Sequence, residues 1–380
     1  MSARSQSDAS IPLARPSISS TGLERVQDVL HSSRLSRGPV LEQFEARMAE
    51  QCGTRHAIGV SSGTAALHCI VRALDLEPGA EVLTTPFSFV ASTNVLLYED
   101  LTPRFVDIDP QSYNLDVMRI EERITPRTQA ILAVDVFGQP VDWPALTHLA
   151  DTHGLALIDD SCEALGATID SQPIGSWGEA AAFGFYPNKQ ITTGEGGCIT
   201  TDRDDVARMC RSLRNQGRSA DGQMRHPRLG YNYRLDELSA ALGCAQLDRL
   251  GEILDRRAAV ADAYQEALAP LTDDLHRPST EPKGTRSWFV YVVRLRDSFE
   301  ANDRDQVMEH LQSNGIGCAP YFPSIHLQPY HRDRLDHAPG DFPICEHVSD
   351  RTIALPFYDA LTLDDVQRVV EVLREALSSL

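Results

Sequence analysis

Residues 185–197 read FYPNKQITTGEGG, and one lysine, Lys189, stands between an apolar run and a glycine-rich turn. The apolar residues 180–185 predict a buried strand that ends shortly before the lysine. A lysine at the end of a buried strand can be partly desolvated, which frees its amine to attack carbonyl groups. The same residues would also suit a surface lysine before a hairpin, so the interpretation depends on motifs elsewhere in the chain.

Three upstream motifs supply the other parts of a cofactor site. Residues 61–66 (SSGTAA) separate a short apolar strand from a helical segment, which predicts a helix N-terminus whose amides can bind an anion. Residues 86–89 (PFSF) supply an aromatic ring, and residues 159–166 (DDSCEALG) supply carboxylates after another apolar strand. An anion site, an aromatic ring for stacking, a carboxylate and an amine are the groups that a binding site for pyridoxal phosphate needs.

The order and wording of these motifs resemble the DegT/DnrJ/EryC1/StrS family of sugar aminotransferases. Residues 229–234 (LGYNYR) and 321–330 (YFPSIHLQPY) strengthen the resemblance, which runs from about residue 38 to the last helix. It implies an α/β fold of the fold type I, aspartate aminotransferase-like class. Such a fold has a large domain with a mainly parallel seven-stranded sheet and a smaller C-terminal α+β domain.

The resemblance assigns the two catalytic roles to Lys189 and Asp160. Lys189 bonds covalently to the cofactor and moves protons, acting as general base and acid. Asp160 pairs with the pyridine nitrogen and keeps it protonated, so that the ring accepts electrons. Its neighbour Asp159 competes for that role, and the periodicity of the strand does not choose between them.

The resemblance also implies contacts to the cofactor from several motifs. Taken alone, the first motif could be only a helix cap, Phe89 only a core residue and Asn232 only a helix-entry residue. We expect Asn232 to reach the cofactor phosphate of a neighbouring subunit. The complete set of expected cofactor-binding residues is Ser62, Gly63, Thr64, Ala65, Phe89, Asp160, Glu163, Lys189 and Asn232.

Substrate contacts are expected from a basic loop, from the lysine motif and from a proline-flanked loop. The family brings the basic loop to an active site, often across the dimer interface. The expected substrate-binding residues are Arg37, Gly38, Pro39, Glu163, Tyr186 and His326. Two positions depart from the common family pattern: Glu163 stands where Gln or His is frequent, and Gly184 stands where a phosphate-binding Ser is frequent.

Composition excludes several classes of function. The 54 acidic and 35 basic residues give a net charge of −19, which argues against binding nucleic acid or an anionic membrane surface. No segment has the length and apolarity of a signal peptide or a membrane span, so we expect a cytoplasmic protein. The eight cysteines are scattered without a C-x-x-C pair, which indicates reduced core residues, and no metal-ligand spacing occurs.

The 380 residues exceed the size of a typical single core and predict two domains. Alternating strands and helices predict a parallel sheet covered on both faces, with the ligand beyond the carboxyl ends of the strands. We expect a loose N-terminal arm over residues 1–18, a large cofactor-binding domain over 19–269 and a small domain over 270–380. A polar loop over residues 214–228 and a domain joint over 270–285 are also expected.

These features predict transamination of a keto sugar, specifically a nucleotide-linked 4-keto-6-deoxyhexose or a 3-keto relative. We expect L-glutamate to be the amino donor. We also expect a homodimer with shared active sites. A cyclitol ketone is an alternative substrate that the motifs do not exclude. The related sugar dehydratases carry His in place of the lysine, and a cysteine desulfurase would need a nucleophilic cysteine on a mobile loop. A non-catalytic sensor would be expected to lose Lys189 or Asp160.

Overall fold

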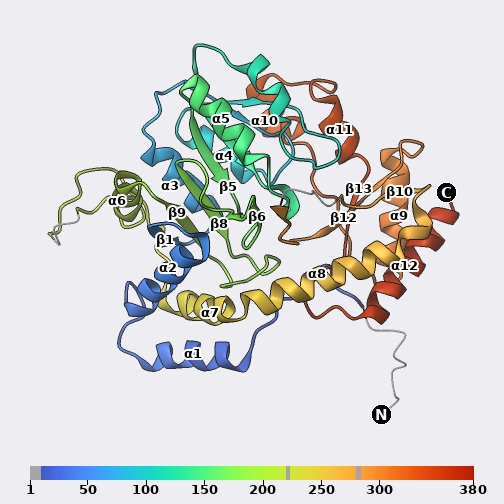
Figure 1. Ribbon diagram of the computed structural model, residues 1–380, viewed down its shortest axis with the longest axis horizontal. Coiled ribbons are helices and arrows are strands. Elements are labelled where there is room, and N and C mark those ends of the chain that lie inside the picture. Colours follow the sequence, from blue (N-terminus) through green and yellow to red (C-terminus); the bar gives the residue numbers. More distant parts are fainter. Residues whose placement is uncertain (1–9, 220–222, 280–283) are drawn as a thin grey trace.

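The computed structural model describes residues 10–219, 223–279 and 284–380, and Figure 1 shows their arrangement. Residues 1–9 of the predicted arm and parts of the predicted loop (220–222) and domain joint (280–283) lie outside these ranges. The largest sheet has seven strands, in the order β1 (His56–Val60), β9 (Gly197–Thr201), β8 (Ala180–Gly184), β5 (Ala156–Asp160), β4 (Thr128–Val134), β2 (Glu81–Thr84) and β3 (Thr102–Phe105).

The pairing of these strands confirms the predicted fold class. Strands β8, β5, β4, β2 and β3 are parallel, whereas β9 runs antiparallel to both β1 and β8. Because parallel strands end at the same edge, the segments that follow β5 and β8 lie close together.

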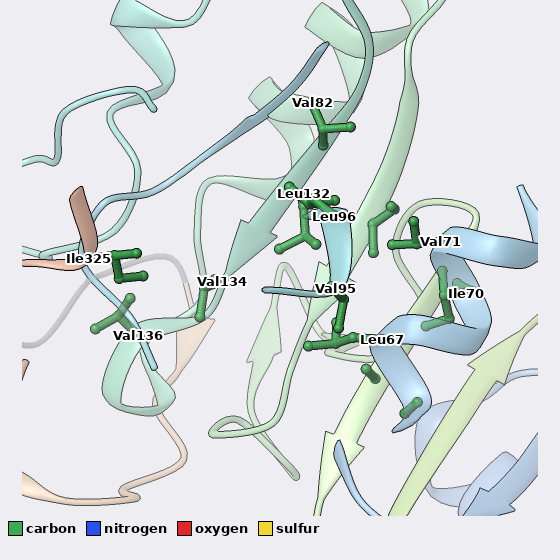
Figure 2. Packing of buried hydrophobic residues seen from close by; sticks show 14 of the residues in the cluster. Leu67, Ile70, Val71, Val82, Val95, Leu96, Leu132, Val134, Val136 and Ile325 are labelled. Atoms are coloured by element: carbon green, nitrogen blue, oxygen red, sulfur yellow. The ribbon is translucent and has the colours of Figure 1, made fainter. Parts of the chain in front are cut away.

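Helices cover both faces of this sheet, as the apolar strands predict. Successive side chains alternate between two cores: Ala130 and Leu132 of β4 face one, and Ile131 and Ala133 face the other. Figure 2 shows the first core, where α3 and α4 pack on β4. The helices on the face of the first core are α3 (Gly63–Ala73), α4 (Ala91–Tyr98) and α6 (Asp204–Leu213). The helices on the opposite face of the sheet are α2 (Pro39–Cys52), α5 (Trp143–His153), α7 (Glu237–Asp248) and the first half of α8 (Leu250–Ala267).

The C-terminal part of the chain has its own antiparallel sheet, in the order β10 (Leu275–His276), β12 (Tyr291–Leu295) and β13 (Thr352–Leu355). Its helices are α9 (Ala301–Ser313), α10 (Pro329–Leu335), α11 (Pro343–Ser349) and α12 (Leu363–Ser378). A third, short sheet joins β11 (Gly284–Thr285), β6 (Thr168–Ile169) and β7 (Gln172–Pro173), while α1 (Ser20–His31) packs on α7. Short 3₁₀ turns occur at Val117–Arg119, Glu121–Arg123, Val136–Gly138, Ala269–Leu271 and Ile325–Leu327.

Helix α8 belongs to both cores. Its first half contributes Leu250 and Ile253 to the core beneath the large sheet, and its second half contributes Val260 and Tyr264 to the core of the C-terminal part. Figure 1 shows it running from α7 to α12. The division of the chain at residues 269 and 270 stays a prediction. Over the described ranges, none of the helices combines the length and apolarity that a membrane crossing requires.

The described residues of the N-terminal arm are not loose, which corrects the expectation for that segment. The amide of Ile11 donates to Gly315 O at 2.9 Å, and the amide of Gly317 donates to Ile11 O at 2.8 Å. Ile11 is 4% exposed and packs in the core of the C-terminal part. The arm is ordered because an isoleucine side chain and main-chain hydrogen bonds fix it, which its polar, proline-containing sequence does not reveal.

We predict that Ile11→Ala lowers the free energy of unfolding by about 2–5 kcal/mol, because it removes a buried aliphatic side chain. Ile18→Ala is the matched control, since Ile18 is 40% exposed; it should change that free energy by less than about 0.5 kcal/mol. Urea unfolding followed by circular dichroism measures both. Equal, small effects of the two substitutions would show that the arm is loose after all.

Candidate active site

A cavity of about 560 Å³ lies at the carboxyl ends of the central strands. It brings together residues that are far apart in the sequence: the start of α3, the segment before α4, the end of β5 and the lysine loop. The predicted site residues that line it are Ser62, Gly63, Thr64, Phe89, Asp160, Glu163, Tyr186 and Lys189.

The N-terminus of α3 forms an anion site at one end of this cavity. Ser62 caps the helix, because its Oγ accepts a hydrogen bond from the amide of Ala65 at 3.0 Å. Ala65 is itself buried and contributes through its main chain rather than by lining the cavity. A Cβ on Gly63 would lie 2.8 Å from Cys162 Sγ, so this position accepts only glycine without a shift. The first amides of a helix lack partners within the helix and favour a phosphate.

Asp160 and Asp159 point in opposite directions, as neighbours on a strand must. Asp160 lines the cavity, and its Oδ2 accepts a hydrogen bond from Ser92 Oγ at 2.7 Å. Asp159 lies on the other side of β5, where it bonds to Ser161 and to the amide of Gly175. Burial, and next the charge of Asp135, raise the pKa of Asp159 well above its usual range. Of the two carboxyl groups, only Asp160 can meet a ligand in the cavity.

Lys189 presents its amine to a carboxylate and an aromatic face. The Nζ atom lies 3.5 Å from Glu163 Oε1 and 4.0 Å from the centroid of the Phe289 ring. The other oxygen of Glu163 accepts a hydrogen bond from the amide of Phe137 at 2.8 Å. Burial raises the pKa of Glu163, whereas the charge of Lys189 acts against that rise. A carboxyl group with a raised pKa beside an amine can exchange a proton with it.

Two aromatic side chains on the cavity wall remain open to solvent. Phe89 is 62% exposed, and Tyr186 is more than half exposed. Single exposed aromatic residues are common, but Phe89 follows β2 and stands at the mouth of a cavity that also holds Asp160. Its ring can therefore stack on a planar ligand that reaches the carboxylate.

Besides Ala65 and His326, four expected residues do not line the cavity of their own chain. Arg37 and Pro39 are exposed, and Gly38 donates its amide to Glu237 Oε1 at 2.7 Å. Asn232 is exposed and forms a main-chain bridge with Asn215. A contact of these four residues with an active site would have to be made in a second copy of the chain.

His326 is fully buried, which corrects the expectation that it binds substrate at the cavity mouth. Its Nε2 lies 3.0 Å from Glu346 Oε1, and its ring packs against Phe342. Burial lowers the pKa of His326, although Glu346 opposes this change. The loop turns the histidine inward because its aromatic surroundings favour a buried ring, and Phe322, earlier in the same loop, lines the cavity instead.

Several cavity residues were missed by sequence reasoning. Ser92 has a recognisable signal, since it follows Phe89 by three residues and can share its face of a helical turn. Phe289 and Tyr321 come from the C-terminal part and carry no local signal. The hydroxyl of Tyr321 accepts a hydrogen bond from Asn188 Nδ2 at 3.4 Å, and burial, with a contribution from Glu163, raises the pKa of Tyr321 to about 12.

The family model described as the DegT/DnrJ/EryC1/StrS aminotransferase family matches residues 16–374. The chain belongs to this family. It is therefore a pyridoxal phosphate-dependent aminotransferase, as its motifs predict. The residues of the cavity fit that cofactor: the α3 N-terminus can hold the phosphate, Phe89 can stack on the ring and Lys189 can bond to the aldehyde.

Individual relatives of this aminotransferase agree with the family assignment. It is 37% identical over 368 residues to a GDP-perosamine synthase of Caulobacter vibrioides, covering 97% of this chain and 98% of the relative. It is 34% identical over 376 residues to the spore coat polysaccharide biosynthesis protein SpsC of Bacillus subtilis, covering 96% of each. One similar solved structure is PseC of Helicobacter pylori, an aminotransferase involved in the biosynthesis of pseudoaminic acid. It superposes with a TM-score of 0.93 at 26% sequence identity, and the match covers 98% of this chain and 100% of that one.

We predict that Asp160→Asn lowers the rate of transamination by roughly 10²- to 10⁴-fold, the range in which a positioned charge or proton partner contributes. Asp159→Asn is the matched control, because the adjacent side chain has the same chemistry but lies on the other side of the strand. It should retain at least about half of the rate, because Asp159 bonds to Ser161 and Gly175 on the side of the strand away from the cavity. Steady-state kinetics of both variants tests the assignment, and a larger loss in the Asp159 variant would reverse it.

Proposed function

We propose that this aminotransferase transfers an amino group from L-glutamate to the ketone of a nucleotide-linked keto sugar, either a 4-keto-6-deoxyhexose or a 3-keto relative. The observation that carries the proposal is the cavity that Lys189, Glu163 and Asp160 line together with the N-terminus of α3. The relatives support the choice of substrate class, since one is named a GDP-perosamine synthase and another takes part in polysaccharide biosynthesis.

When bound, pyridoxal phosphate supplies an electron sink that lets a carbon–hydrogen bond next to nitrogen break. Within the described residues, Lys189 is the lysine that lines the cavity, and its Nζ is the atom that would bond to the cofactor and move the proton to and from that carbon. Asp160 keeps the ring nitrogen protonated, and Ser92 holds the Asp160 carboxylate in place.

Glu163 gives Lys189 a partner for its proton. The two side chains approach within 3.5 Å, and the amide of Phe137 fixes the far oxygen of the carboxylate. The Phe289 ring lies against the amine, and Tyr321 and Phe322 add further aromatic surface to the same cavity. We propose that this arrangement lets Lys189 alternate between its charged and neutral forms during the two halves of the reaction.

We also propose a homodimer with shared active sites. Asn232, Arg37 and Pro39 are exposed and do not line the cavity of their own chain, so a second copy of the chain is the place where they can meet the phosphate and the substrate. Glu237 supports this segment, because its carboxylate accepts the amides of Gly38 and Val40 at 2.7 and 2.9 Å.

We expect the purified enzyme, supplied with L-glutamate, to aminate a GDP- or dTDP-linked 4-keto-6-deoxyhexose, so that mass spectrometry detects the amino sugar nucleotide. The Lys189→Ala variant is the control and should give no product. The panel should also contain a cyclitol ketone. Product from the cyclitol alone would replace the proposed substrate class, and no product from any ketone would remove the support for sugar transamination.

Mixed dimers test the shared site. We predict that Lys189→Ala and Asn232→Ala subunits, each weakly active or inactive alone, regain activity when they are co-expressed with different tags and purified as a heterodimer. One of the two sites then contains a native Lys189 and a native Asn232 from the other subunit. If Asn232 served its own chain instead, neither site would be complete and the heterodimer would stay inactive.

A further inference from the structure

We propose that Arg257 is a positioning residue for Lys189. Arg257 lies in α8 between the half that packs under the large sheet and the half that packs in the C-terminal core. Its side chain is 4% exposed, although arginine is rarely buried without a specific reason. This inference rests on the proposed role of Lys189 as the residue that bonds to the cofactor.

The guanidinium of Arg257 joins two segments of the active site. Its Nη2 donates to the main-chain oxygen of Lys189 at 3.1 Å. Its Nη1 donates to the main-chain oxygens of Trp288 and Phe289 at 3.3 and 3.2 Å. All three acceptors are main-chain carbonyl groups, and only a planar guanidinium can reach them with two nitrogens held in a fixed fork.

These contacts connect Arg257 to the reactive amine by two routes, through Lys189 itself and through Phe289. Arg257 holds the main chain of Lys189 and of Phe289, and the Lys189 Nζ lies 4.0 Å from the centroid of the Phe289 ring. The amide of Lys189 is fixed as well, because it donates to Tyr186 O at 2.9 Å. The position of the amine relative to Phe289 and Glu163 therefore depends on the arginine.

The next residue in the chain strengthens the same connection. Gln190 donates from Nε2 to the main-chain oxygen of Glu163 at 2.5 Å and to Ser287 Oγ at 2.9 Å. The segment that carries Lys189 is thus attached both to the Glu163 segment and to the strand entry at residues 287–289. Of the attachments between these segments, the hydrogen bond from Arg257 is the one made to Lys189 itself.

The guanidinium of Arg257 also lies over the Phe357 ring of the C-terminal core, at 5.4 Å from its centroid. Burial lowers the pKa of Arg257 to about 10, and Asp359 only partly opposes this. A buried charge is costly unless it is well paired and hydrogen-bonded. Here the hydrogen bonds go to carbonyl groups around the reactive lysine, so the arginine is placed where its loss would displace that side chain.

The test compares Arg257→Met and Arg257→Lys with Arg304→Met. Arg304, in α9, is a matched control. Its guanidinium also donates to a main-chain oxygen, that of Ser349, at 3.1 Å. Three quantities are measured: the thermal midpoint of the cofactor-free protein, the dissociation constant for pyridoxal phosphate from its visible absorption, and the rate of modification of Lys189 by trinitrobenzenesulfonate in cofactor-free protein. Peptide mass spectrometry follows that modification between about pH 6 and 10, where an amine titrates.

We expect Arg257→Met to raise the dissociation constant at least about tenfold and to lower kcat about 100-fold, as a displaced reactive group does. The rate at which trinitrobenzenesulfonate modifies Lys189 should also change. Arg257→Lys should keep a thermal midpoint near that of the wild type yet show the same losses, because an ammonium group lacks the fork. Arg304→Met should match the wild type in cofactor affinity and in Lys189 modification.

The inference is overturned if the Arg257 variants keep wild-type cofactor affinity and Lys189 reactivity, or if Arg304→Met loses them equally. If Arg257→Met does not fold, Arg257→Lys decides the question. A wild-type protein that develops no visible band with pyridoxal phosphate would instead contradict the proposed function. A wild-type band together with unaffected Arg257 variants would remove only the role of the arginine.

Discussion

The active site depends on the parallel pairing of β5 with β8. This pairing sets Asp160 opposite Ala182, so the two strands leave the sheet at the same edge and in the same direction. The carboxylate at the end of β5 and the lysine loop that follows β8 consequently share one cavity. A shift of one residue in this register would turn Asp160 away from the cavity and bring Asp159 towards it, because neighbouring side chains on a strand face opposite sides. The buried surroundings of Asp159 oppose such a shift.

The second constraint comes from α8, which connects the two cores. The large sheet and the segments attached to it supply the carboxylate, the anion site and the lysine, but residues 289, 321 and 322 of the cavity come from the C-terminal part. Arg257 of α8 joins the main chain of Phe289 to that of Lys189, and Phe322 packs on Phe87 and Phe137 of the large-sheet core. The large-sheet part thus carries Asp160, the α3 N-terminus and Lys189, and the C-terminal part adds aromatic side chains to the same cavity.

Sequence patterns could predict what is local and periodic. The strand at residues 56–60 and the helix at 143–153 have strong apolar patterns, and the structure has them as β1 and α5 with those bounds. Motifs likewise identified Lys189 and the α3 N-terminus, because glycine and serine at those positions have a direct physical meaning. The choice between Asp159 and Asp160 could not come from periodicity, since it depends on which face of the strand meets the cavity.

Long-range contacts escaped the same reasoning. Phe289, Tyr321 and Arg257 reach the site only after two distant parts of the chain pack together, and no local pattern marks them. His326 was misplaced for a similar reason: its loop was correctly associated with the site, but the orientation of a single side chain depends on Phe342 and Glu346 from a later helix region. Ile11 was missed because one buried residue outweighs the polar composition around it.

The most direct test of this account is the visible absorption spectrum of the purified enzyme with pyridoxal phosphate, recorded before and after addition of L-glutamate. The account predicts a visible band that requires Lys189, and L-glutamate should convert it to the spectrum of pyridoxamine phosphate. Absence of the band after incubation with the cofactor, or an unchanged band in Lys189→Ala, would contradict the central role of Lys189. A band that does not respond to L-glutamate but responds to another amino acid would change the donor and leave the site intact.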